Sequence, residues 1–172
     1  MLTVQVGATI PTMPDITLLL HNIRSTHNVG SILRSAEGFG VARVILTGYT
    51  PYPALANDSR LPHIRDKLTA QIHKTALGAE MMIPVEYHAD PHTWLTSNRL
   101  PLLALEQAPH SMDIRGFTPP EEFVLLLGEE VHGIEEALLA RADTILEIPM
   151  HGSKESFNVS VAAAIAMYQL TA

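Results

Sequence analysis

The chain has no cysteine among its 172 residues. This absence excludes disulfide bonds, thiolate metal ligands and a cysteine nucleophile, and it fits a reducing compartment. The N-terminus has no basic segment ahead of an apolar one, which argues against a signal peptide. The apolar runs at 16–20, 123–127 and 161–167 are far shorter than a membrane span. We therefore expect a cytoplasmic protein that does not enter a membrane.

Aromatic and basic residues are also scarce. Aromatic residues make up 5% of the chain although 47% of it is hydrophobic, so the core must be aliphatic. The net charge of −7 is unfavourable for a nucleic-acid partner. However, residues 1–80 hold seven basic residues against five acidic ones, while residues 81–172 hold four against thirteen. We expect any polyanion to meet the N-terminal half, although chance on a solvated surface also produces such an asymmetry.

Several well-known site motifs are missing from the sequence. No G-x-G-x-x-G follows the first apolar run, which excludes the usual dinucleotide fingerprint. Neither a Walker A loop nor a G-x-S-x-G elbow occurs. The nine histidines show no H-E-x-x-H or other ligand spacing, so we expect no metal site.

Apolar segments of strand type and helix type alternate along the chain. The run at 16–20 is typical of a buried strand, and apolar residues from Val29 onward follow it at helical spacing. Asn28 stands where an N-cap belongs. Further strands are expected at 44–46, 82–87, 102–105, 123–127 and 144–148, and further helices at 67–80, 91–97, 134–141 and 158–170.

This alternation predicts one α/β domain over residues 1–172, with a parallel sheet of about six strands and helices on both faces. Residues 1–15 contain two prolines and are expected to be irregular. Residues 48–65 are expected to form a long loop, and a loop of this length is usually functional or mobile.

Two polar stretches follow predicted strands, at the edge where open α/β sheets bind ligands. The first, Asn28–Arg34, lies at a helix N-terminus, which suits an anion. The second, Gly128–Gly133, contains the adjacent carboxylates Glu129 and Glu130. Each also has a plain structural explanation, because a cap, a surface charge or an acidic residue near a helix N-terminus needs no ligand.

A third polar stretch, Ile148–Asn158, lies between the last strand and the last helix. It contains a glycine, Ser156 and Asn158, which place small hydrogen-bonding groups where a ligand can approach the backbone. Helix capping is the alternative explanation for either polar residue.

In this order and spacing, the three stretches resemble the SpoU (TrmH-type) branch of the SPOUT RNA methyltransferases. The family patterns are N-x-G-x-x-x-R, then G-x-E-x-x-G, then I-P-M-x-G-x-x-x-S-L-N-V-S-x-A. The matching residues are Asn28, Gly30 and Arg34; Gly128, Glu130 and Gly133; and Ile148, Pro149, Met150, Gly152, Ser156, Asn158, Val159 and Ser160. Glu129 replaces the usual Asn or Ser, and Phe157 replaces leucine. The resemblance runs from about Leu18 to the C-terminus.

The resemblance implies an α/β fold whose C-terminal segment forms a trefoil knot. It also implies a homodimer in which each site is completed by the second subunit. The knot builds a pocket for S-adenosyl-L-methionine, the methyl donor. By position, the cofactor-binding residues in this chain would be Leu105, Gly128, Ile148, Ser156 and Phe157.

The implied reaction is methylation of a ribose 2′-OH in tRNA or rRNA, without a metal. Arg34 is expected either to remove the hydroxyl proton or to orient the ribose and its phosphate; a guanidinium is normally protonated. Asn28 is expected to position Arg34 or the ribose, and Glu130 to hold Asn158 or its loop. Ser156 and Asn158 would line the boundary between cofactor and substrate.

Two alternatives stay open at this stage. The chain could be a SPOUT enzyme that methylates a base nitrogen, or a non-catalytic knotted module for RNA binding or dimerisation. No accessory RNA-binding domain is expected within residues 1–172, so RNA must contact the core dimer, the 48–65 loop or a partner protein. This favours tRNA over rRNA as the substrate.

Overall fold

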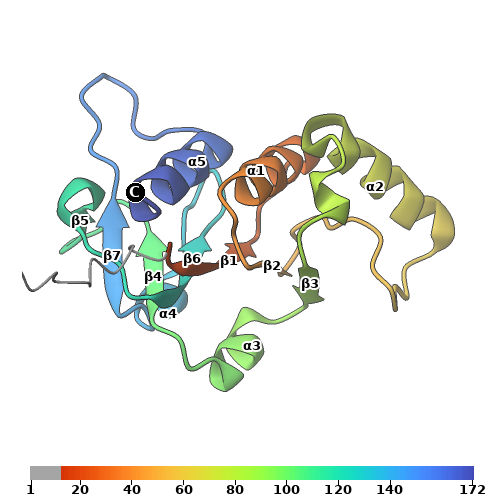
Figure 1. Ribbon diagram of the computed structural model, residues 1–172, viewed down its shortest axis with the longest axis horizontal. Coiled ribbons are helices and arrows are strands. Elements are labelled where there is room, and N and C mark those ends of the chain that lie inside the picture. Colours follow the sequence, from red (N-terminus) through yellow and green to blue (C-terminus); the bar gives the residue numbers. More distant parts are fainter. Residues whose placement is uncertain (1–12) are drawn as a thin grey trace, which may run out of the picture.

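The computed structural model describes residues 13–172 and is built around a parallel sheet of seven strands (Figure 1). The strand order is β3-β2-β1-β6-β4-β7-β5, and every pair of neighbouring strands is parallel. The strands are β1 (Asp15–His21), β2 (Arg43–Thr47), β3 (Val85–His88), β4 (Leu102–Leu105), β5 (Met112–Asp113), β6 (Glu122–Leu127) and β7 (Thr144–Glu147).

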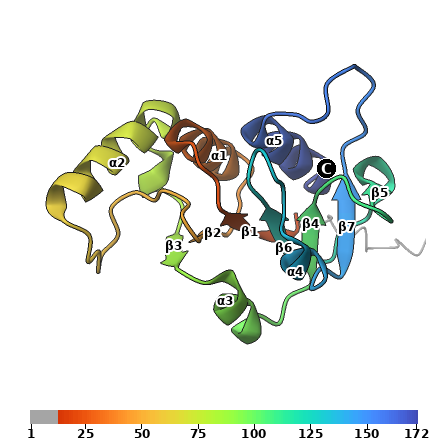
Figure 2. The same cartoon turned by 180° about the vertical axis from the view of Figure 1, so that it is seen from behind.

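Helices cover both faces of the sheet, as predicted. One face carries α1 (Thr26–Gly38), α2 (Pro62–Ala76) and α5 (Val159–Leu170), and the other carries α3 (Pro91–Ser97) and α4 (Glu136–Leu139) (Figures 1 and 2). Two short 3₁₀ turns, Ala79–Met81 and Ile114–Gly116, complete the regular structure of residues 13–172. Within residues 13–172, no helix is long and apolar enough to cross a membrane.

The two central strands, β1 and β6, are buried on both faces. Leu18 pairs with Leu125, and both contribute to the core under α1 and α5. Leu19 and Leu126 point to the opposite face and pack in the core under α3 and α4. Strands covered on both faces are continuously apolar, which is why the runs at 16–20 and 123–127 identified them in the sequence.

Helix α1 begins earlier than the sequence predicted. Its N-cap is Ser25, whose side chain accepts a hydrogen bond from Asn28 N at 3.3 Å, so the prediction that Asn28 is the cap was wrong. The error arose because the first turn is polar and hides the helical period. Since Asn28 lies inside the first turn, its own side chain is available for other contacts.

Other element boundaries also differ from the predictions. Helix α2 begins at Pro62, a residue suited to the first turn of a helix, so the expected loop at 48–65 is shorter. Strand β3 spans Val85–His88 instead of 82–87, and α4 is confined to Glu136–Leu139. The two-residue strand β5 lies within an expected loop, and its pairing with β7 adds a seventh strand. Residues 13 and 14 precede β1 as irregular chain, and the remainder of the expected irregular N-terminal segment lies outside the described residues.

Gly30 is explained by helix packing. A Cβ atom at this position would lie 2.2 Å from Thr75 Oγ1 and 2.4 Å from the carbonyl oxygen of Ile72. Both neighbours belong to α2. Only a glycine therefore permits α1 and α2 to approach as closely as they do.

Candidate active site

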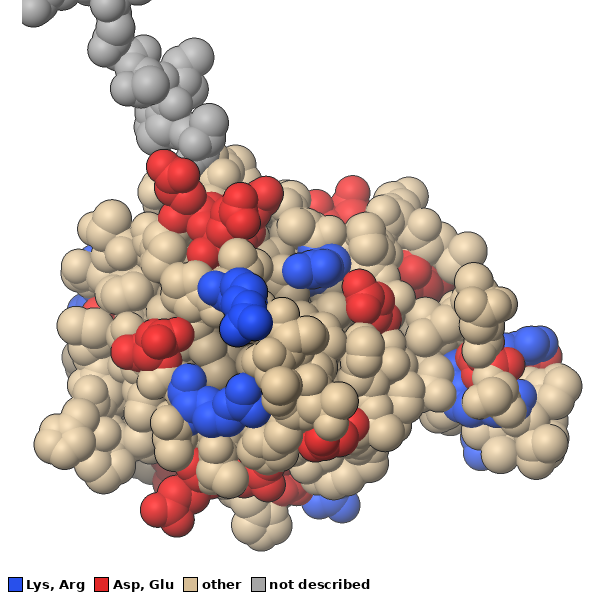
Figure 3. Space-filling model, turned by 90° about the horizontal axis from the view of Figure 1, so that it is seen from below, with Lys and Arg blue, Asp and Glu red and all other residues tan. Residues whose placement is uncertain are grey.

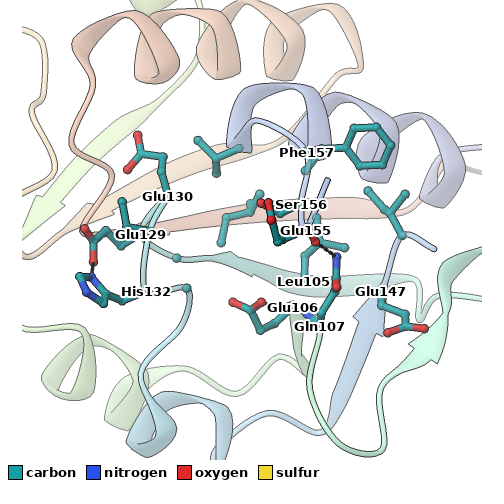
Figure 4. A pocket seen from close by; sticks show the side chains of 17 residues that line it. Leu105, Glu106, Gln107, Glu129, Glu130, His132, Glu147, Glu155, Ser156 and Phe157 are labelled. Carbon is teal, nitrogen blue, oxygen red and sulfur yellow. Dashed lines mark hydrogen bonds and ion pairs between the residues drawn. The ribbon is translucent and has the colours of Figure 1, made fainter. Parts of the chain in front are cut away.

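A pocket of about 290 Å³ opens at the carboxyl ends of β4, β6 and β7 (Figure 4). This is the edge of a parallel sheet at which ligands bind in open α/β proteins. Its walls come from the segments that follow these three strands and from the start of α5. The lining residues are Leu105, Glu106, Gln107, Leu127, Gly128, Glu129, Glu130, Val131, His132, Gly133, Glu147, Ile148, Glu155, Ser156, Phe157, Val159 and Ala162.

The five residues predicted to bind a cofactor all line this pocket. Leu105 ends β4, Gly128 follows β6 and Ile148 follows β7, while Ser156 and Phe157 precede α5. Residues separated by up to 52 positions in sequence thus surround one space. The structure places them together, and their role in binding a cofactor stays a prediction.

The turn after β6 requires glycine at two positions, Gly128 and Gly133. Glu129 and Gly133 exchange backbone hydrogen bonds of 3.1 and 2.9 Å, and Gly133 has a positive φ of 71°. A Cβ on Gly128 would lie 2.6 Å from the Gly133 carbonyl oxygen. Glu106 Oε2 anchors the far side of the turn by accepting a hydrogen bond from Ile134 N at 2.9 Å. This turn holds Glu130 at the edge of the pocket.

Glu130 lies at the centre of a hydrogen-bond network that joins the three polar stretches. Its Oε1 accepts from Asn28 Nδ2 at 2.8 Å, and its Oε2 accepts from Arg24 N at 3.1 Å. The Asn28 amide oxygen in turn accepts from Asn158 Nδ2 at 3.2 Å. Asn158 also caps α5 by accepting a hydrogen bond from Ser160 N at 2.9 Å. The network therefore connects the N-terminal ends of α1 and α5.

This network favours the ionised form of the Glu130 carboxyl. Partial burial raises the pKa of the Glu130 carboxyl, but the hydrogen bonds from Arg24 N, Asn28 Nδ2 and Ser25 N outweigh burial and lower the pKa below its ordinary value. The expected link between Glu130 and Asn158 is indirect, because Asn28 stands between them. Asn28 hydrogen-bonds these two residues and not Arg34.

Arg34 does not join this arrangement within the single chain. It follows Asn28 by six residues, which is about 9 Å along a helix, and its side chain is exposed. It does not line the pocket, and its side chain makes no hydrogen bond or ion pair with any residue in the range 13–172. Of the predicted catalytic residues, the structure thus brings together Asn28, Glu130 and Asn158 and places exposed Ser156 on the pocket wall, but leaves Arg34 apart.

The pocket is acidic. Five glutamates and one histidine line it, and no lysine or arginine does. Among the glutamates, Glu129 contacts His132 Nδ1 at 2.8 Å and Glu147 Oε2 accepts from Ser111 Oγ at 2.7 Å. The pocket walls are joined where Gln107 Nε2 donates to the Glu155 carbonyl oxygen at 2.9 Å. Within the described residues, no group of three or more potential ligands is arranged to hold a metal ion.

Sequence reasoning missed Glu106, Gln107 and Glu147 as pocket residues. The first two directly follow β4, and the third ends β7. Their position at the carboxyl ends of predicted parallel strands was a signal that could have identified them, because all such ends meet at one edge.

The model of the SpoU rRNA Methylase family matches residues 15–168. A tRNA (guanosine(18)-2′-O)-methyltransferase of Escherichia coli K12 is 29% identical over 159 residues, which cover 91% of this chain and 62% of that protein. The 23S rRNA (guanosine-2′-O-)-methyltransferase RlmB of Nitrosomonas europaea is 30% identical over 167 residues, covering 92% of this chain and 56% of that protein. The chain thus spans about three fifths of the length of these curated relatives.

Solved structures show the same fold. The AdoMet-bound rRNA methyltransferase from Sinorhizobium meliloti superimposes with a TM-score of 0.75 at 23% identity, covering 93% of this chain and 57% of that one. The family match extends from the first residue of β1 to within α5 and includes all three polar stretches. The chain therefore belongs to the SpoU rRNA methylase family.

Proposed function

We propose that the chain transfers a methyl group from S-adenosyl-L-methionine to a ribose 2′-OH of a structured RNA. The observation that carries this proposal is the network of Asn28, Glu130 and Asn158 at the rim of the pocket. It brings one residue from each family motif to one place. The curated relatives named above, which act on guanosine of tRNA and of 23S rRNA, support the same reaction.

The pocket fits the proposed methyl donor in chemistry. Leu105, Ile148 and Phe157 offer apolar walls for an adenine ring, and the lining glutamates attract positive charge. S-adenosyl-L-methionine, when bound, supplies an electrophilic methyl group on a positively charged sulfonium. In this proposal, the segment Ile148–Asn158 is the knotted loop that the resemblance implies, and its backbone holds the cofactor.

The chain's own residues would then orient the substrate. Asn28, fixed on both sides by Glu130 and Asn158, presents a rigid amide beside the pocket. Ser156 lies on the pocket wall and would line the boundary at which the ribose hydroxyl meets the methyl group of the cofactor. Positioning of this kind accelerates a transfer because the reacting groups meet in the correct geometry. Arg34 would orient the hydroxyl and the adjacent phosphate, since a guanidinium remains protonated at ordinary pH.

Arg34 can act in this way if a second copy of the chain completes the site, and we propose a homodimer for this reason. Arg34 lies exposed on α1, which packs beside α5. On α5, Val161 and Tyr168 are 46% and 66% exposed, and an apolar face of this kind suits a subunit contact. Light scattering after gel filtration should give twice the chain mass, and Tyr168→Glu should give the monomer. A monomeric wild-type protein would contradict this part of the proposal.

RNA would approach from the N-terminal half, including the segment between β2 and α2. Seen from the side of α3 and α4, acidic and basic side chains of the described residues are interspersed, without a broad basic area (Figure 3). That face is therefore a poor surface for a polyanion. The proposed RNA surface lies on the opposite face of the sheet, which carries α1, α2 and α5, near the N-terminus of α1 (Figure 1).

The decisive experiment combines the purified chain, labelled S-adenosyl-L-methionine and either unmodified tRNA or unmodified rRNA. Mass spectrometry of the digested nucleosides should detect a 2′-O-methyl nucleoside, and the RNA that carries it identifies the substrate class. A methyl group on a base would support the base-methylating alternative instead. Absence of cofactor affinity in calorimetry would support the non-catalytic module.

A further inference from the structure

A second hollow, of about 520 Å³, lies beside the candidate active site. We call it the α1–α2 groove. It is formed by the N-terminal end of α1, the segment after β2, the middle of α2 and the end of β3. The residues that line it are Arg24, Ser25, Thr26, Gly48, Tyr49, Thr50, Pro51, Tyr52, Arg60, Leu68, Gln71 and Tyr87.

One wall of the groove is a rigid stack of side chains. The Tyr52 and Tyr87 rings stack with centroids 4.1 Å apart, and the Arg60 guanidinium lies 3.5 Å from the Tyr52 centroid on that ring. Arg60 is held in place by an ion pair with Asp58, whose side chain is 2% exposed. Arg60 also donates to the carbonyl oxygens of Tyr52 and Pro53, each at 2.9 Å. The wall is thus formed before any ligand arrives.

The opposite part of the groove presents two exposed groups, Tyr49 and Arg24. Tyr49 is 56% exposed, and its backbone N–H donates to Asn22 Oδ1 at 3.1 Å. The preceding residue, Gly48, has a φ of 66°, and a Cβ there would lie 2.0 Å from Asn22 Oδ1. This tight turn holds Tyr49 out towards solvent. Arg24 is 63% exposed.

The groove joins the candidate active site but lacks its acidic lining. Arg24 N donates to Glu130 Oε2 at 3.1 Å, and the Arg24 guanidinium lies 3.7 Å from Glu129. The groove is lined by two arginines and no acidic residue, whereas the pocket is lined by five glutamates and no lysine or arginine. Arg60 is neutralised by its ion pair with Asp58, but the Arg24 side chain is 63% exposed, so a phosphate can reach its guanidinium. The glutamates of the pocket repel a phosphate and attract a sulfonium.

We propose that the α1–α2 groove binds the unpaired nucleotide next to the methylated ribose, with its base stacked on Tyr49 and its phosphate paired with Arg24. This inference rests on the proposed function and identifies where the substrate backbone enters the site. Exposed aromatic rings beside cationic side chains are the usual means of binding single-stranded RNA, because every base has a face that stacks.

The test measures binding of a short, fluorescein-labelled, single-stranded RNA of mixed sequence by anisotropy. Tyr49→Leu keeps an apolar side chain but loses the ring, and it should weaken binding about five- to a hundred-fold. Tyr49→Phe keeps the ring and should bind as the wild type does. Arg24→Gln should reduce the slope of log affinity against log salt by about 0.7. Arg115→Gln, an exposed arginine outside both hollows, is the matched control.

The outcomes separate this inference from the proposed function. Wild-type binding by both Tyr49→Leu and Arg24→Gln would overturn the groove assignment, as would a wild-type protein that binds no RNA. Calorimetric affinity for S-adenosyl-L-methionine should be unchanged in both variants, and a parallel loss would show that they disturb the fold instead. If RNA binding follows the expected pattern while no methyl transfer occurs on any RNA, the proposed function fails; the groove then binds single-stranded RNA, but its place next to a methylated ribose is overturned.

Discussion

Replacing Glu130 with glutamine tests the central network, because the substitution keeps the shape of the side chain and removes its charge. Glu130 Oε1 accepts from Asn28 Nδ2 at 2.8 Å and from Ser25 N at 3.4 Å, and Oε2 accepts from Arg24 N at 3.1 Å. A glutamine must place its NH₂ group at one of these two oxygen positions. There it faces an N–H donor, so at least one hydrogen bond is lost whichever way the amide turns.

The size of the effect follows from the charge of the acceptor. Hydrogen bonds to charged groups contribute about 1.5–3 kcal/mol each. We expect Glu130→Gln to lower the free energy of unfolding by about 2–3 kcal/mol at pH 7, measured by urea denaturation. Glu122→Gln, at the exposed first residue of β6, is the matched control and should change the free energy by less than about 0.5 kcal/mol.

The same experiment at lower pH tests the cause. Burial raises the pKa of Glu130, but its hydrogen bonds lower the pKa by more than burial raises it. The pKa in the folded protein therefore lies below the value in an unfolded chain, which is about 4.3. The stabilisation is therefore fully present above about pH 4.3 and is lost as the pH falls through the folded pKa. As the pH falls from about 4.3 through the folded pKa, the difference in unfolding free energy between the wild type and Glu130→Gln must therefore shrink. No deficit at pH 7, or an equal deficit in strong acid, would refute the reasoning.

Three further substitutions address other parts of the molecule. Gly30→Ala places a methyl carbon 2.2 Å from a threonine hydroxyl of α2 and should cost about 1–3 kcal/mol in thermal denaturation. Gly38→Ala, where a Cβ meets nothing within 4 Å, should cost nothing, and an equal loss there would contradict the packing explanation. Arg34→Ala should abolish methyl transfer and leave calorimetric cofactor affinity intact; near-normal transfer would show that Arg34 is not essential. Asp58→Asn breaks the ion pair that orders the segment before α2, and limited proteolysis should cleave that segment faster, whereas an unchanged rate would show that the pair does not order it.

The central part of the fold was predictable because it depends on patterns that burial imposes directly. Strands covered on both faces must be apolar throughout, and β1 and β6 are. Helix α5 was equally clear, since Asn158 caps a run that has no charged residue. The convergence of the three polar stretches also followed from the sequence, because each comes after a strand of one parallel sheet.

Features set by contacts between distant segments were not predictable. Ser25 and Asn28 are both good caps, and only the geometry of the first turn shows that Ser25 is the cap and that Asn28 hydrogen-bonds Glu130. The short β5 shows no periodicity of its own, and its pairing with β7 defines it as a strand. The stacked wall of the α1–α2 groove joins Tyr52 to Tyr87, residues 35 positions apart whose side chains had no recognisable motif.

The close approach of α1 and α2 at Gly30 fixes the distance between the α1–α2 groove and the candidate active site. Helix α1 carries Asn28 at the active site, and α2 contributes Leu68 and Gln71 to the α1–α2 groove. Because backbone meets side chain at Gly30 without room for even a methyl group, nothing between the helices can repack to change their separation. The helix pair thus keeps a fixed distance between the α1–α2 groove and Asn28 at the candidate active site. Under the proposed function, an RNA would then be selected by whether its backbone can bend to span that distance, whatever bases it carries.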